Sequence, residues 1–149
     1  MSTTKRTKRV SRLKQIEDSE LSLRLTKLNE LIGKRQIEIG RRQQLIVAFE
    51  RQGQSEAANS GRVEQLRGQL YWMEHLSLSI RKVDERIAKI NATIEHQRGL
   101  VLEQKAKVRG WETLIDQMVA QEKADKGNQE AAEADDRYLA RGQLGTKTS

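Results

Sequence analysis

A heptad of apolar residues, running from Val83 to Met118, constrains this chain more than any other feature. Along this stretch the apolar positions follow one another in alternating steps of three and four residues, with Gln97 and Gln104 filling two of them. That spacing keeps one face of an α-helix apolar, and a sustained seven-residue repeat is typical of left-handed coiled coils. The pattern therefore predicts a long helix that packs against another helix along a narrow seam.

The composition of the 149-residue chain agrees with a seam rather than a globular core. Only 36% of its residues are hydrophobic and 3% aromatic, whereas 33% are charged, and proline is absent. Long and coiled-coil helices have this composition. A disordered chain can share the high charge but lacks the periodicity. We therefore expect an all-α fold.

A first helical pattern covers about residues 11–52, and the second covers about residues 62–141. In the first, Arg35 and Arg42 occupy seam positions, which their long aliphatic stems permit. The apolar positions of the first pattern are Leu21, Leu25, Leu28, Ile32, Ile39, Ile46 and Phe49. The second pattern opens with Val63, Leu66, Leu70 and Met73. Between Met73 and Val83 its register slips by one short step.

Residues 53–61 separate the two patterns. Two glycines, two serines and an asparagine within this segment predict a turn, and Asn59 or Ser60 could cap the second helix. Neither helix alone can bury its apolar stripe, so we expect an antiparallel coiled-coil hairpin over residues 11–141, with the second helix the longer. Residues 1–10 would be a basic arm and residues 142–149 a flexible tail. The alternative is one continuous helix that dimerises in parallel.

Folding the chain about residue 57 places Leu28 near Ile87 and Leu21 near Ile94. The amino end of the first helix (helix 1) then lies opposite about residue 105 of the second helix (helix 2). The apolar stripe continues beyond that point, without an internal partner. Such an overhang is a helix face that fits a partner's groove or, alternatively, a second copy of the chain. Its members are Val108, Trp111, Ile115, Met118 and Val119.

The slip in register predicts a second interaction face. Trp72, Leu76, Ser79 and Val83 lie four, three and four residues apart, beside the main stripe. Together the two stripes are wider than one helix can cover, and a tryptophan at the edge suits an interface anchor. Local overwinding that hides both stripes is the alternative.

The sequence shows no residue pattern typical of a catalytic, cofactor-binding or metal-binding site. Cysteine is absent, and His75 and His96 are 21 residues apart with no carboxylate set around them. We expect no enzymatic activity, no cofactor and no small-molecule substrate. No apolar run long enough to span a membrane is present, and the basic start has no apolar segment behind it, so we expect a cytoplasmic protein.

Charge is unevenly distributed, although the net value is +7. Residues 1–14 hold six bases and no acid, whereas residues 111–141 hold eight acids and four bases. A nucleic-acid-binding coiled coil is one alternative, because clustered bases neutralise phosphates. The run is short, however, and has neither an asparagine for base contacts nor a stacking aromatic. We expect instead that it lies beside the acidic part of helix 2.

The whole pattern resembles the FliJ family of flagellar type III export proteins. The likeness covers nearly the whole chain: a basic first helix, a polar turn near residue 57, a longer second helix, the segment Val108–Leu114 and a charged stretch ending in Glu133–Arg141. The resemblance implies a stalk similar to the rotary ATPase γ subunit and to YscO-type secretion proteins. The stalk's terminal end would enter the hexameric export ATPase, and the middle of helix 2 would contact the cytoplasmic domain of the export gate.

Family positions fall on particular residues here. The gate-contacting face corresponds to Trp72, Leu76, Ser79 and Val83, of which Ser79 and Val83 depart from the family's residue types. The ATPase tip would use Lys5, Arg9 and the overhang. The resemblance also implies handling of export chaperones, and a location at the cytoplasmic face of the inner membrane. Contact with the membrane would be indirect, through the export apparatus. A generic scaffold coiled coil is a further alternative.

Overall fold

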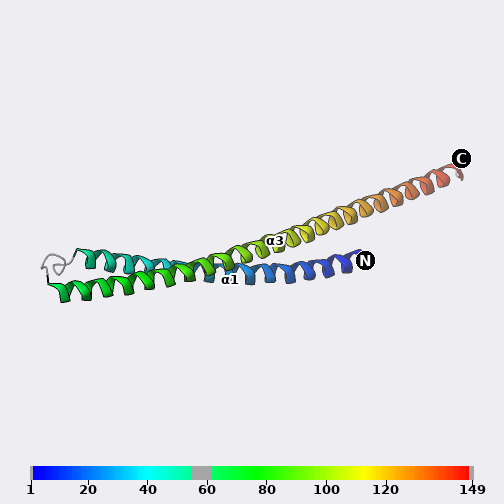
Figure 1. The fold of residues 1–149 in the computed structure, drawn as a ribbon. Helices are drawn as coiled ribbons and strands as arrows, with labels where there is room; N and C mark the ends of the chain where they lie inside the picture. Colours follow the sequence, from blue (N-terminus) through cyan, green and yellow to red (C-terminus); the bar gives the residue numbers. More distant parts are fainter. Residues whose placement is uncertain (1, 55–61, 148–149) are drawn as a thin grey trace. The chain divides into compact units, whose positions relative to one another are not determined.

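The described part of the chain is entirely helical in the computed structural model. Backbone is described for residues 2–54 and 62–147, and side chains for residues 5–54 and 62–142. Helix α1 spans Ser2–Gly53 and helix α3 spans Val63–Lys147, with no strand in these ranges (Figure 1). The predicted all-α fold is confirmed, and the second helix is the longer, with 85 residues against 52.

The helix boundaries differ from the predicted ones at both ends. The basic residues before position 11 belong to α1, because no proline or glycine interrupts them and Lys and Arg are good helix formers. The predicted tail is helical as far as Lys147. At the predicted turn, Gly53 is still helical, and the candidate caps Asn59 and Ser60 lie outside the described residues.

The chain divides into two compact units, each an antiparallel pair of helix segments. The hairpin unit is Leu21–Glu103, and the terminal unit joins Met1–Glu20 to Gln104–Ser149. In the hairpin unit, Arg35 Nη1 donates to Asn91 Oδ1 at 3.1 Å. In the terminal unit, Thr7 Oγ1 donates to Glu122 Oε1 at 2.6 Å.

The pairing register in the hairpin unit is not the predicted one. Arg42 pairs with Asp84 at 2.5 Å, and the Gln69 side chain donates to the Gln52 carbonyl. Relative to these contacts, the predicted Leu28–Ile87 pairing is wrong by about ten residues, or roughly 15 Å of helix. The reason is that the first turns of α3 extend past the carboxyl end of α1. Gln52 lies opposite Gln69 rather than opposite the first turn of α3.

The seam of α3 is one continuous heptad, with no slip. All of its positions are buried or half-buried, and they alternate in steps of three and four. In the hairpin unit they are Leu66, Gln69, Met73, Leu76, Ile80, Val83, Ile87, Ile90, Ile94, Gln97 and Val101. In the terminal unit they are Gln104, Val108, Trp111, Ile115, Met118 and Glu122. The predicted slip arose from assigning Leu70 to the seam. Leu70 is 61% exposed, and Gln69 takes the position instead.

The seam of α1 carries more charge than predicted. Arg35 and Arg42 occupy it as expected. Glu38, rather than the predicted Ile39, faces α3 and is only 9% exposed. Its carboxylate accepts from Arg41 Nη1 at 2.8 Å and Arg86 Nε at 3.2 Å. Because both oxygens are paired, the carboxylate can lie at the helix–helix interface despite its charge.

No helix in the described ranges combines the length and the apolar character that crossing a bilayer requires.

Candidate interaction surfaces

The last described part of α3 is exposed to solvent. Glu122 is half-buried against Thr7, but every described side chain from Lys123 to Gly142 is exposed. Figure 1 shows α3 running on past the N-terminal end of α1 to its red end. We call residues 123–142 the α3 extension.

The extension begins later than the sequence indicated. Val108 is 7% exposed, and Trp111, Ile115 and Met118 are half-buried. These four predicted overhang residues therefore belong to the seam of the terminal unit. The cause is the shifted register, which places the start of α1 opposite Glu122 rather than near residue 105.

The extension is stabilised mainly by side-chain pairs within α3 itself. Gln121 Nε2 donates to Asp125 Oδ1 at 2.9 Å, and Arg137 pairs with Glu133 at 3.8 Å. Exposed pairs of this kind contribute only a few tenths of a kcal/mol, roughly 0.2–0.5 each. Tyr138 and Leu139 are large exposed side chains on this lone helix. A helix so weakly supported gains stability by docking into a groove of another molecule.

The first turns of α1 present a basic surface. Lys14 pairs with Glu112 at 3.8 Å, so the expected contact between the basic start and the acidic part of α3 does form at this residue. Of the bases before it, Lys8 and Arg12 line a shallow hollow with Glu122 of α3. Those exposed to solvent are Lys5, Arg6, Lys8, Arg9 and Arg12.

The predicted gate face does not exist as one exposed stripe. Leu76 and Val83 are 5% and 3% exposed and pack in the seam, and Ser79 is half-buried. Trp72 alone of the four is well exposed, at 45%. The stripe was inferred from the slip, so it disappears with the slip.

A different apolar surface surrounds Trp72, and sequence reasoning missed it. The Trp72 ring stacks on His75, with centroids 5.4 Å apart. Tyr71 and Leu78 are exposed and share this outer face, since they lie four residues before and three residues after His75. We call Tyr71, Trp72, His75 and Leu78 the aromatic patch. Their spacing could have revealed the patch had the seam been placed through Gln69.

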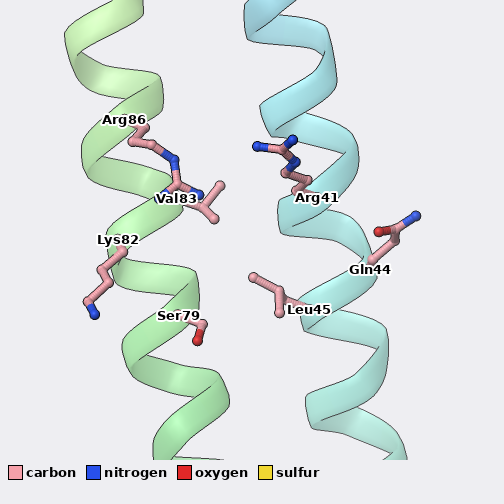
Figure 2. Close-up of a pocket in the computed structure, with 7 residues that line it drawn as sticks. All are labelled: Arg41, Gln44, Leu45, Ser79, Lys82, Val83 and Arg86. Carbon is pink, nitrogen blue, oxygen red and sulfur yellow. The ribbon is translucent and has the colours of Figure 1, made fainter.

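A shallow groove of about 330 Å³ crosses the hairpin unit (Figure 2). Its floor is apolar, with Leu45 and Val83 facing each other, and its rim carries the cations of Arg41, Lys82 and Arg86. Ser79 is the only hydroxyl that Figure 2 labels, and no histidine or carboxylate lines the groove beside it. The lining offers no acid–base pair and no activated nucleophile.

Metal binding finds no site in the part of the chain that the structure describes. There, no group of three or more His, Cys, Asp or Glu side chains is placed to hold an ion.

The surfaces and the fold together define a two-helix antiparallel coiled coil with a lone helical extension. No protein-family model matches the chain, and neither a curated protein nor a solved structure matches it.

Proposed function

We propose that this chain is a non-enzymatic stalk of the bacterial flagellar type III export apparatus, which links the export ATPase ring to the export gate and handles export chaperones. The α3 extension is the observation that carries the proposal. A paired coiled coil with one helix prolonged beyond the other is the geometry that the resemblance to FliJ implies. Its place of action would be the cytoplasmic face of the inner membrane.

The terminal unit supplies the part that enters the ATPase ring. Its tip combines the bases of the first α1 turns, Lys5 and Arg9 among them, with the mixed charges of the α3 extension. Polar loops lining a ring can pair with both signs of charge. Trp111 and its seam neighbours act behind the tip, where they hold the two helices together rather than contact the ring.

The hairpin unit supplies the contact with the export gate. Exposed aromatic side chains are frequent anchors of protein interfaces, and the aromatic patch provides three rings. In this proposal Trp72 and Tyr71 contact the gate. Leu76 and Val83 support the patch from the seam beneath and do not reach the partner.

The test is the effect of the purified chain on the hexameric export ATPase. We expect the full chain to promote ring assembly or hydrolysis, and a chain that stops after Glu122 to lose this effect. A chain that stops after Gly142 is the matched control and should retain it. If the full chain changes neither assembly nor hydrolysis, the stalk proposal is wrong.

A further inference from the structure

The outward face of the first α1 turns is basic. Lys5, Lys8, Arg9 and Arg12 follow one another at the spacing that places side chains on one helix face, and all four are exposed. Thr7, Val10 and Lys14 occupy the opposite face, which packs against α3.

Exposed apolar side chains continue this basic face. Ile16 follows Arg12 by four residues and is 64% exposed, so it lies on the same side of the helix. Leu13, beside it, is also exposed. A helix face that joins several bases to exposed aliphatic side chains matches the composition of helices that lie on membrane surfaces.

The first acidic residues of α1 interact with groups outside this face. The carboxylate of Glu17 accepts a hydrogen bond from the Gln104 side chain and is turned toward α3. Asp18 pairs with Lys14 at 3.4 Å. No acidic residue precedes these two in the chain. Glu122 of α3 lines a hollow with Lys8 and Arg12, and its carboxylate accepts a hydrogen bond from Thr7. With four exposed bases, the basic face keeps a net positive charge toward solvent.

These bases lie in the first turns of α1. The amino end of an α-helix carries partial positive charge, so bases in the first turns are unfavourable there. An anionic surface would interact favourably with both the bases and the helix end.

A nucleic acid is a poorer match for this face than a lipid surface. Residues 5–20 contain no aromatic side chain for stacking on bases and no asparagine. The exposed Ile16 and Leu13 would gain nothing from a phosphate backbone, whereas they suit the boundary between headgroups and acyl chains.

We propose that Lys5, Lys8, Arg9 and Arg12, with Leu13 and Ile16, bind directly to the surface of an anionic phospholipid bilayer. This membrane contact shares Lys5 and Arg9 with the proposed ATPase tip, so one chain makes only one of the two contacts at a time, and vesicle binding is measured without the export ATPase or the gate. Each base near an anionic leaflet strengthens binding about fivefold at moderate salt. The aliphatic pair adds a part of the binding that salt does not screen.

The experiment measures co-sedimentation of the full chain with vesicles. We expect binding to phosphatidylcholine vesicles that contain about 30 mol% phosphatidylglycerol, and little binding to phosphatidylcholine alone. Replacing Lys5, Lys8, Arg9 and Arg12 together by alanine should weaken binding by roughly several hundredfold. The matched control removes four bases from the α3 extension (Lys123, Lys126, Arg137 and Arg141) and should retain most of the binding.

Two further measurements keep the proposal open to refutation. Circular dichroism of each variant reports whether the helices persist, and Leu13→Ser with Ile16→Ser should weaken the binding that remains at about 0.5 M salt. The proposal is overturned if the chain does not bind the anionic vesicles. It is equally overturned if the control variant loses as much binding as the α1 variant, or if the α1 bases bind duplex DNA or RNA but not vesicles.

Discussion

Gln104 of α3 donates its side-chain amide to the backbone oxygen of Glu17 on α1, at 3.0 Å, and also to the Glu17 carboxylate. The glutamine is almost completely buried, and it occupies a seam position of the terminal unit. A polar seam residue that finds its partner in only one alignment of two helices selects that register over its neighbours. This pair therefore aligns the start of α1 with the second half of α3.

Replacing Gln104 by alanine should lower the free energy of unfolding by about 1–2 kcal/mol, because a buried hydrogen bond and side-chain packing are both lost. Urea unfolding followed by circular dichroism measures the change. Gln129→Ala, on the exposed α3 extension, is the matched control and should shift stability by less than about 0.5 kcal/mol. Equal effects of the two substitutions would contradict a role for Gln104 in the register.

The fold class could be predicted from the sequence because it depends on a repeat that is written along the chain. The heptad from Val83 to Met118 requires a partner helix, and the glycine-flanked segment between the two patterns allows the chain to supply it. The repeat alone does not determine the register, that is, which residue of α1 lies opposite which residue of α3. Sliding one apolar heptad along another by several residues changes the apolar contacts little, whereas polar pairs such as Arg35–Asn91 are made in one alignment only.

The surfaces were less predictable because they depend on which residues enter the seam. Gln69 and Glu38 are polar, so a search for apolar spacing passes over them and selects Leu70 and Ile39 instead. Gln69 and Glu38 are buried because each interacts with a residue on the other helix. That error in the α3 seam placed Leu76 and Val83 on a surface and left the aromatic patch unrecognised.

Glu38 offers a test of the charged seam. Glu38→Ala should destabilise the chain by about 1–2 kcal/mol, less than a fully buried ion pair, because Arg41 and Arg86 stay partly hydrated when they lose their acceptor. A double-mutant cycle with Arg86→Ala measures the coupling, which we expect near 1 kcal/mol. The control is Glu95→Ala, which breaks an exposed pair with Arg98 and should change stability by less than about 0.5 kcal/mol. Coupling near zero would show that the cross-helix pair does not stabilise the hairpin unit.

Ile94 tests the apolar part of the seam. It is fully buried, with 0% exposure, so Ile94→Ala should lower the free energy of unfolding by about 3 kcal/mol. Leu102→Ala removes an aliphatic side chain that is 67% exposed and should have an effect below about 0.5 kcal/mol. A small effect at Ile94 would mean that the helices do not pair through this face.

Spin labels at positions 42 and 84 distinguish the hairpin from a parallel dimer of continuous helices. The chain has no cysteine, so Arg42→Cys with Asp84→Cys gives two unique labelling sites. Because these side chains pair across the two helices, the labels should lie about 1–2 nm apart within one molecule. In one continuous helix they would be separated by roughly 6 nm. Dilution with unlabelled chain should leave the short distance unchanged, and its loss on dilution would favour the dimer.

Trp72 and Leu76 are neighbours on α3 with opposite expected roles. Trp72→Ala should leave the free energy of unfolding within about 0.5 kcal/mol, because the ring is exposed, but it should weaken binding to the cytoplasmic domain of the export gate by tenfold or more. Leu76→Ala should instead lower stability and leave gate binding nearly unchanged at low temperature. It should cost about 2–3 kcal/mol of stability from the seam and change gate binding little while the helices stay paired. Titration calorimetry and urea unfolding of the same two variants measure both quantities. If Trp72→Ala binds the gate domain as tightly as the unmodified chain, the aromatic patch is not the gate contact.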